Sequence, residues 1–458
     1  MPQRDFTRRT FLMGALALTA GCATTGRRGP RAVSPNEKLN VAGIGVGGKG
    51  QSDIHECRSE NIVALCDVDE HMLLKAKEMF PNAATYSDYR VMLDKHPEID
   101  AVTVSTPDHT HAHAALTAMS QGKHVYVQKP MAHNIYEARV MTEAAHKYGV
   151  TTQMGNQGHS GEGVRRCVEM VQSGVIGKIR EAHCWTDRPG IADRPWWPQG
   201  VADPYPAEPV PAHLDWDLWL NAAQHRDYNS KYAPFNWRGW WDFGCGALGD
   251  MACHVMDPAM WALELGAPTS VELIEQDSGT MQTGPLSEII RYEFPERGDH
   301  PALTLYWYDG GSKPPHPKGV STDEKLGSGT NGSYFVGDDG IITMNTYGEN
   351  ARLLPESQMD DYTPPSQTIR RIAEMPAGSI SDHAHRMDWI DACKGGPKPG
   401  SNFDFAGPFT ETVLMGTIAA RVPGKLLWDS KKMRFSNSDA ANTYIRREYR
   451  NGWNIDNI

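Results

Sequence analysis

The chain has 458 residues, of which 40% are hydrophobic and 22% charged, and its formal net charge is −11. The length predicts two domains, and the composition is that of a globular protein. Basic residues gather before residue 33, so the remainder is more acidic still, which argues against a nucleic acid partner. The eight cysteines show no CxxC spacing, and seven remain once Cys22 is set aside. We therefore expect no disulfide framework, and we predict no metal site.

The first 37 residues are typical of an export signal followed by a linker. Arg8 and Arg9 precede a short apolar run that ends at Ala20, too short to span a membrane. Paired arginines indicate the twin-arginine route, and the small residues before Cys22 make that cysteine a candidate lipid anchor. We expect a periplasmic or otherwise exported protein. The alternative is an amphipathic or disordered N-terminus with chance arginines.

A dinucleotide-binding fingerprint follows the linker. A buried strand predicted over 39–45 leads into a G-x-G-x-x-G motif at Gly45, Gly47 and Gly50, and a helix-like stretch comes next. A second strand, predicted over 61–67, ends in Asp67, whose carboxylate would accept hydrogen bonds from the adenosine ribose. Because a carboxylate repels a 2′-phosphate and no arginine follows, the motif favours NAD over NADP. The alternative is a glycine turn in an unrelated α/β protein.

Strands and helices continue to alternate up to residue 155. We expect strands over 100–105, 123–128 and 150–155, and helices over 109–121 and 134–149. Such repeats form a parallel sheet whose ligands lie beyond the carboxyl ends of the strands. Three polar motifs occur at those ends, and their sequences are STPDHTH (105–111), QKP (128–130) and MGNQGH (154–159).

The middle of the chain is rich in proline and tryptophan over 188–212, which excludes a regular helix or central strand there. The indoles of Trp196 and Trp197 would suit the CH-rich face of a sugar ring. The alternative is a structural lid or an oligomer contact. Further along, Asp250 and His254 are four residues apart, so on a helix they share one face. A carboxylate beside an imidazole can orient it and raise its pKa, as a general base requires. Most helical histidines, however, have only a structural role.

The last part of the chain predicts a mostly antiparallel sheet. Extended stretches over 269–276, 287–294, 302–311, 332–337 and 340–345 are separated by turn residues. Helices are expected near 380–394 and 407–421, and 312–332 is expected to be a surface excursion.

From residue 39 onward, these motifs in this order resemble the Gfo/Idh/MocA family of oxidoreductases. The resemblance implies an α/β protein, with an N-terminal Rossmann domain and a C-terminal α/β domain that contains a large, mostly antiparallel sheet. Together with the signal and linker over 1–37, we therefore expect an NAD-binding domain over 38–158 and a substrate-binding and oligomerisation domain over 159–458. Such sheets commonly assemble dimers or tetramers, so we expect a homodimer or homotetramer.

The resemblance also assigns roles to residues. It implies that Lys129 and His254 flank the reacting carbon and that Asp250 completes a catalytic trio. Family members usually have Glu-Lys-Pro where this chain has Gln128-Lys129-Pro130, which removes one carboxylate beside the lysine. The candidate cofactor-binding set is Gly45, Val46, Gly47, Gly48, Gly50, Asp67, Ser105, Thr106, Pro107, His111, Gln128 and Lys129.

The sequence therefore predicts an exported NAD-dependent oxidoreductase that acts on a ring hydroxyl of a sugar or glycoside, with a tightly bound cofactor regenerated on the enzyme. The candidate substrate-binding residues are Asn156, Gln157, His159, Trp196, Trp197 and His254. A second hypothesis is an NAD-dependent glycosidase that oxidises transiently, eliminates and reduces again. A third is a sugar-binding lipoprotein that has lost its cofactor.

Overall fold

The computed structural model describes residues 29–191, 194–372, 382–456 and 458. Most of the predicted export signal, including Arg8, Arg9 and Cys22, lies outside these described residues. Within them, no helix is both long enough and apolar enough to cross a lipid bilayer.

The N-terminal domain is built on a six-stranded parallel sheet with the strand order β3-β2-β1-β4-β5-β6. The central strands consist mostly of apolar residues buried on both faces, as in a parallel sheet covered by helices. The prediction of a Rossmann domain is confirmed. The strands are β1 (Asn40–Ile44), β2 (Asn61–Cys66), β3 (Ala84–Tyr86), β4 (Ala101–Val104), β5 (His124–Val127) and β6 (Thr152–Met154).

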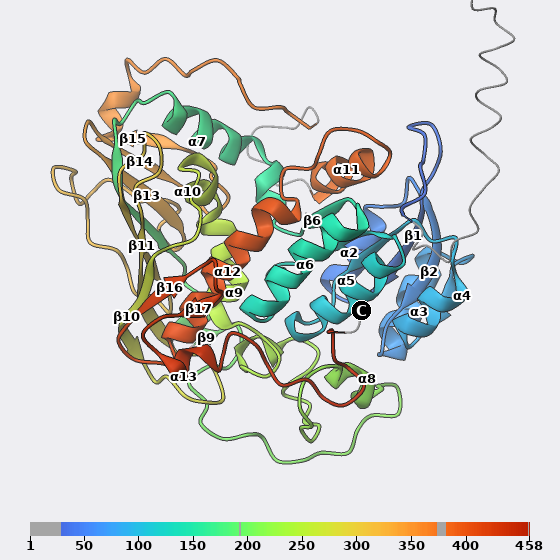
Figure 1. The fold of residues 1–458 in the computed structure, drawn as a ribbon. Helices are drawn as coiled ribbons and strands as arrows, with labels where there is room; N and C mark the ends of the chain where they lie inside the picture. The colour runs from blue at the N-terminus through green and yellow to red at the C-terminus, as the bar shows by residue number, and fades with distance from the viewer. Residues whose placement is uncertain (1–28, 192–193, 373–381, 457) are drawn as a thin grey trace, which may run out of the picture.

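Several of the helices that connect these strands begin or end at recognisable capping residues. The Asp69 side chain caps α3, the Asn134 side chain caps α6, and Gly149 ends α6 in the left-handed conformation. Figure 1 shows α5 and α6 side by side on one face of the sheet. The helices are α2 (Lys49–His55), α3 (Glu70–Met79), α4 (Tyr89–Lys95), α5 (His111–Ser120) and α6 (Ile135–Tyr148), with a 3-10 turn η1 (Asp108–Thr110) before α5.

The second domain contains a nine-stranded sheet with the order β15-β14-β13-β7-β12-β11-β10-β16-β17. Every neighbouring pair is antiparallel except β7 and β12. The predicted mostly antiparallel sheet is therefore confirmed. Its strands are β7 (Ile179–Trp185), β10 (Ser270–Asp277), β11 (Ser287–Phe294), β12 (Leu303–Tyr308), β13 (Gly332–Gly337), β14 (Ile341–Met344), β15 (Arg352–Leu354), β16 (Lys425–Asp429) and β17 (Arg434–Phe435).

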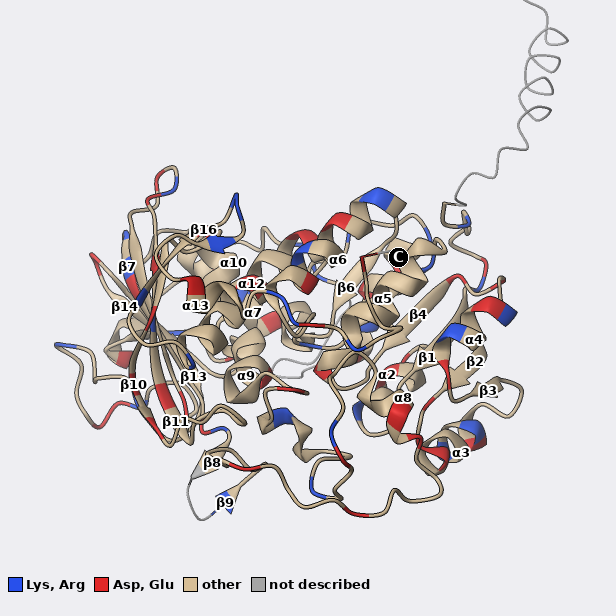
Figure 2. Cartoon of the chain, turned by 60° about the horizontal axis from the view of Figure 1, so that its bottom comes forward, with Lys and Arg blue, Asp and Glu red and all other residues tan. Residues whose placement is uncertain are grey.

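Helices cover one face of this sheet. Alternate residues of β11, among them Ile290 and Tyr292, are buried against them. Figure 1 shows the sheet at one side of the molecule with helices between it and the first domain. In Figure 2 the Lys and Arg positions are interspersed with Asp and Glu over the elements in view. The helices are α7 (Glu162–Gln172), α9 (Gly246–Val255), α10 (Asp257–Ala262), α12 (Phe403–Ala419) and α13 (Asp439–Asn442), and the 3-10 turns are η2 (Gln157–Ser160) and η4 (Glu356–Met359).

A long excursion between β7 and α9 lies against the first domain. Its described part over 188–212 holds no helix, only the two-residue strands β8 (Gly190–Ile191) and β9 (Arg194–Pro195), as predicted. Its later part, with α8 (Trp216–Leu220) and η3 (Asn236–Gly239), folds around its own aromatic core. That core contains Trp216, Trp219, Tyr228, Tyr232, Trp237, Trp240 and Phe243.

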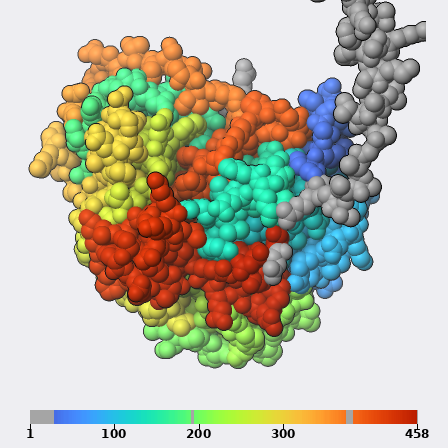
Figure 3. Space-filling model, viewed as in Figure 1, coloured from blue at the N-terminus to red at the C-terminus, as the bar shows by residue number. Residues whose placement is uncertain are grey.

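One helix from the C-terminal part of the chain returns to the first domain. Trp389 and Ile390 of α11 (Asp382–Cys393) pack in one apolar cluster with Val41 and Tyr126 of the parallel sheet. Figure 3 shows the C-terminal residues against the N-terminal domain on the face in view. The core of the first domain therefore includes a helix that comes after the expected boundary at residues 158 and 159.

Candidate active site

The glycine loop after β1 fits the dinucleotide fingerprint because side chains are sterically excluded from it. A Cβ at Gly50 would lie 1.9 Å from the Gly45 carbonyl oxygen, so any larger residue would separate loop and helix. Gly45 has a φ of +73°, and a Cβ there would lie 2.8 Å from Thr106 Cγ2. The loop therefore holds the close turn that a pyrophosphate needs.

Asp67, directly after β2, is fixed beside this loop. Its Oδ2 accepts hydrogen bonds from the backbone N–H groups of Val46 (2.8 Å) and Gly47 (3.1 Å), and its Oδ1 accepts one from Asp69 N–H (3.0 Å). Burial raises the pKa of Asp67, and these three donors oppose the rise. The carboxylate thus lies at the strand end where a ribose would bind.

The loop, Asp67 and parts of both domains enclose one cavity of about 630 Å³. It has the size and mixed lining of a cofactor or substrate site. Of the predicted cofactor-binding residues, those that line it are Gly45, Gly47, Gly48, Asp67, Ser105, Thr106, Pro107, Gln128 and Lys129.

The remaining three predicted residues, Val46, Gly50 and His111, do not line the cavity but pack against residues that do. Val46 is buried and Gly50 packs on Gly45. The ring of His111 lies between the carbonyl oxygens of Pro130 (2.9 Å) and Thr106 (2.8 Å). Burial lowers the pKa of His111 to about 4, so a neutral imidazole joins these two loops.

The three predicted catalytic residues all line the same cavity. Lys129 Nζ donates hydrogen bonds to Asp250 Oδ1 (2.6 Å) and to the Asp250 carbonyl oxygen (2.8 Å). Burial favours the protonated form of Asp250, but Lys129 and then Arg238 outweigh it and lower the pKa of the carboxyl to about 2. The pair is therefore a mostly buried ion pair at the cavity wall.

His254 differs from the expectation in two ways. The structure contains no hydrogen bond between His254 and Asp250 among the described residues, because the Asp250 carboxylate is bound to Lys129. Asp250 raises the pKa of His254, as expected, but burial and Lys129 outweigh this effect and lower the pKa to about 3. The prediction that Asp250 orients His254 is wrong for this structure. The imidazole is neutral, its buried Nδ1 has no hydrogen-bond partner in the described part of the chain, and Tyr347 lies edge-on to the ring at 5.0 Å.

Comparison with protein families agrees with this architecture. Residues 39–156 match the family described as "Oxidoreductase family, NAD-binding Rossmann fold", and residues 161–293 match its "C-terminal alpha/beta domain". This protein belongs to the Gfo/Idh/MocA oxidoreductase family. Its N-terminal domain is the NAD-binding domain of that family, and the glycine loop and Asp67 fit this cofactor.

Two curated relatives cover part of the chain. A 1-carboxy-3-chloro-3,4-dihydroxycyclohexa-1,5-diene dehydrogenase of Comamonas testosteroni is 33% identical over 126 residues, which are 28% of this chain and 32% of the relative. A "Glycosyl hydrolase family 109 protein 1" of Shewanella sp. (strain ANA-3) is 29% identical over 202 residues, which are 38% and 44% of the two chains. The match thus spans less than half of these relatives.

Solved structures share the fold over more of the chain. The WlbA dehydrogenase of Bordetella pertussis, solved with NADH and UDP-GlcNAcA, has a TM-score of 0.57 at 15% identity and covers 86% of this chain and 99% of its own. A levoglucosan dehydrogenase, solved with NADH and levoglucosan, has a TM-score of 0.58 at 18% identity and covers 85% and 99%. At these identities the likeness shows the fold alone.

Gln128, which stands where the Gfo/Idh/MocA family usually has the glutamate of Glu-Lys-Pro, belongs to a buried hydrogen-bond network around Asp53. Gln128 Nε2 donates a hydrogen bond to Asp53 Oδ2 (2.6 Å), and Ser105 Oγ donates to the same oxygen (2.7 Å). Arg386 of α11 binds the other oxygen of this fully buried carboxylate, and Lys49 Nζ lies 3.2 Å from it. The carboxylate in this network belongs to Asp53, and a glutamate at 128 would place a second one against it.

Two cavity residues that the sequence analysis did not single out, Arg238 and Asp108, lie close to the Lys129–Asp250 pair. Arg238 Nε is 3.5 Å from Asp250 Oδ1, and its guanidinium packs on the rings of Phe235 and Trp237. Asp108 is buried beside them and accepts a hydrogen bond from Cys245 N–H. Burial raises its pKa to about 7, against the opposing effect of Lys129. The aromatic stretch over 235–241 could have indicated Arg238 as a site residue. For Asp108 the only indication was its position in the STPDHTH motif.

Of the predicted substrate-binding residues, only Gln157 and His254 line the cavity. Gln157 Nε2 is buried and has no hydrogen-bond partner among the residues that the structure describes, so it could donate to a ligand. Asn156 accepts a hydrogen bond from Ser401 Oγ (2.5 Å), and His159 Nδ1 lies 2.9 Å from Asp257 while its ring stacks on Trp261. Both are buried outside the cavity lining.

The expected tryptophan wall does not line the cavity either. Trp197 is 2% exposed and donates its indole N–H to Gln199 (2.9 Å). Trp196 is 55% exposed, with the Arg188 guanidinium 3.9 Å above its ring. The aromatic side chains in the wall come instead from Tyr89, Trp219, Tyr228, Phe235 and Trp237.

Proposed function

We propose that this protein is an NAD-dependent oxidoreductase that oxidises a ring hydroxyl of a sugar or glycoside. The observation that carries the proposal is the Lys129–Asp250 ion pair, with neutral His254 beside it, in the cavity that also contains the glycine loop and Asp67. A fixed cation and a neutral imidazole at one wall are the groups that a proton-coupled hydride transfer requires.

When bound, NAD supplies a nicotinamide carbon that accepts hydride from the sugar carbon. The Lys129 ammonium, held by Asp250, would donate a hydrogen bond to the reacting hydroxyl oxygen and stabilise the negative charge that develops there. His254 is uncharged at neutral pH, and its Nε2 would accept the hydroxyl proton. The carboxylate of Asp250 offsets the positive charge that the imidazole then gains. Gln157 would bind a neighbouring hydroxyl through its unpartnered amide.

A direct test begins with the nucleotide that the purified protein carries. Denaturation should release about one NAD per chain. A panel of sugars and glycosides, each paired with a sugar or aldehyde acceptor, should give an oxidised sugar and a reduced acceptor. Lys129→Ala should lower kcat by about 10²- to 10³-fold, the loss typical of removing one stabilising donor. A protein without nucleotide, or a Lys129→Ala variant with unchanged turnover, would refute the proposal.

A second candidate is a glycosidase that uses NAD without net redox change. It is favoured by the relatives named "Glycosyl hydrolase family 109 protein 1", at 29% identity, and "Alpha-N-acetylgalactosaminidase" of Shewanella oneidensis, at 28%. Asp108, with a pKa raised to about 7, would be a carboxylic acid able to protonate a leaving group at neutral pH. Free sugar released from a glycoside, with no oxidised product, would identify this activity.

Export and assembly form a further part of the proposal. The paired arginines support passage by the twin-arginine route with the cofactor already bound, and Cys22 supports a lipid anchor. Fractionation of cells should then place the protein in the periplasm, and replacing Arg8 and Arg9 by lysine should retain it inside. The large sheet supports a homodimer or homotetramer, which light scattering of the purified protein would measure.

A further inference from the structure

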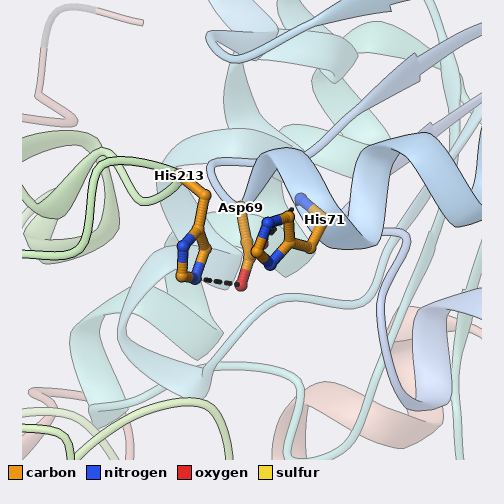
Figure 4. A group of neighbouring side chains, drawn as sticks. All are labelled: Asp69, His71 and His213. Atoms are coloured by element: carbon orange, nitrogen blue, oxygen red, sulfur yellow. Dashed lines mark hydrogen bonds and ion pairs between the residues drawn. The ribbon is translucent and has the colours of Figure 1, made fainter.

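Two histidines and an aspartate from separate parts of the chain meet at the rim of the cavity. Figure 4 shows His71 and Asp69 at the start of α3, with His213 facing them from the long excursion. One ligand atom from each residue lies within 4.8 Å of the other two. This grouping is not part of the proposed catalytic machinery, and no motif in the sequence predicts it.

Backbone contacts hold the two segments together. Glu70 N–H donates a hydrogen bond to the His213 carbonyl oxygen (2.8 Å), and Asp215 N–H donates one to the Val68 carbonyl oxygen (2.9 Å). Asp69 and Leu214 form an antiparallel bridge between them. These main-chain contacts therefore fix how far the His213 side chain lies from those of Asp69 and His71.

Among the described residues, Asp69 Oδ2 and the ring nitrogens of both histidines make no hydrogen bond. Asp69 Oδ1 accepts hydrogen bonds from the N–H groups of His71 and Met72 as the cap of α3, which anchors the carboxylate and leaves Oδ2 open. That oxygen lies 3.8 Å from His213 Nε2. Among the described residues, no hydrogen bond uses a ring nitrogen of His71 or His213. Their rings stack on each other, with centroids 4.0 Å apart and planes 14° apart.

We propose that Asp69, His71 and His213 bind a divalent ion of the zinc class and so join the excursion to the NAD-binding domain. Imidazole nitrogens with a carboxylate oxygen are ligands that Zn²⁺ prefers, while Mg²⁺ prefers oxygen alone. With bonds of about 2.1 Å, tetrahedral ligands lie about 3.4 Å apart, so the atoms must approach by little more than an ångström. Because a metal lies in the plane of its imidazole ligand, the stacked rings must turn, and the exposure of His71 and the half-exposure of His213 allow this.

Three protein ligands leave one coordination position for water. Asp69 and His213 also line the cavity, and Asp67, which the glycine loop holds, is bonded through Oδ1 to Asp69 N–H. A metal at this place would fasten the excursion beside the strand end where the ribose is expected. This last point rests on the proposed NAD site, but the metal site itself does not.

The test is a metal titration of the untagged holoprotein after treatment with EDTA. Calorimetry should show one Zn²⁺ per chain, Co²⁺ should give the visible absorption of a tetrahedral site, and Mg²⁺ should not compete. His71→Ala and His213→Ala should each weaken binding at least tenfold. Asp69→Asn, which keeps a side-chain cap for α3, should weaken it as well. His225→Ala, at an exposed position of the same excursion, is the matched control and should bind as the wild type does.

Thermal melting separates metal binding from a merely structural role. In EDTA the His71→Ala variant should melt with the wild type, and added Zn²⁺ should raise the melting temperature of the wild type alone. Because His71 is exposed, this variant decides the matter even if His213→Ala fails to fold. Absence of Zn²⁺ binding by the wild type, or equal binding by His71→Ala, overturns the proposal. NAD release measured in parallel tests the cofactor site independently, because it needs no metal.

Discussion

Replacement of Asp250 by asparagine gives a test of the active-site ion pair that needs no known substrate. A carboxyl whose pKa falls from 3.8 to about 2 on folding contributes about 2 kcal/mol to the free energy of unfolding at neutral pH. Asparagine keeps the shape but cannot carry the charge, and it leaves Lys129 without its counterion. We therefore expect Asp250→Asn to lower the unfolding free energy by about 2–3 kcal/mol at pH 7.

The pH dependence provides the sharper criterion. Because the pKa of Asp250 is lower in the folded state, its contribution is present above the unfolded value of 3.8 and is lost as the pH falls through the folded value. The difference between wild type and variant should stay nearly constant from pH 7 to pH 5 and fall to about half at pH 3.

The assay is urea unfolding, followed by tryptophan fluorescence at a fixed NAD concentration, since bound ligand adds to stability. Asp338→Asn is the matched control, because the Arg180–Asp338 pair is exposed on both sides and should contribute less than about 1 kcal/mol. Equal stability of Asp250→Asn and wild type at pH 7, or a difference that grows toward pH 3, would refute the reasoning.

Three further predictions follow from buried charge and close packing. Gln128→Glu should cost about 3 kcal/mol at pH 7 and less at pH 5 in urea unfolding, because the new carboxylate meets that of Asp53 and protonation relieves the repulsion. Asp108→Asn should stabilise the protein by up to about 4 kcal/mol at pH 8 and by less than half of that at pH 5. The reason is that the pKa of Asp108 rises from 3.8 in the unfolded chain to about 7 in the folded protein, so ionisation of the folded carboxyl is destabilising. Equal effects at both pH values would contradict this prediction. Gly50→Ala should abolish NAD binding, because its Cβ would meet the Gly45 carbonyl. The nucleotide released on denaturation measures this loss. The control variant Gly266→Ala should retain NAD, because a Cβ there meets nothing within 4 Å.

Local patterns in the sequence predicted most of the fold. The strand expected over 332–337 is β13, and the stretch over 287–294 is β11, because alternating or continuous apolar residues determine both. β7, by contrast, was not assigned as a strand. Its place between β12 and β13 depends on partners more than a hundred residues away, which no local pattern encodes.

The candidate site was predicted where a motif carries steric meaning and missed where tertiary packing decides. The glycine loop was predicted from a motif whose steric demands few residues meet, and Lys129 was assigned through the resemblance to the Gfo/Idh/MocA family; both line the cavity. Trp197 and His159 were misplaced, because an indole or an imidazole suits a sugar site and a protein core equally well. Arg238 reaches the cavity only through the fold of the excursion around its aromatic core.

The return of α11 to the first domain has a consequence for the order in which the chain is made. Arg386, which binds the buried carboxylate of Asp53, follows it by 333 residues. At translation rates of about 5–20 residues per second, Arg386 is added roughly 20–60 s after Asp53. Until then the Asp53 carboxylate, which lies behind the glycine loop, lacks the arginine that binds it in the folded protein. A nascent chain that ends before residue 382 should therefore bind NAD poorly, although every residue of the fingerprint is already present.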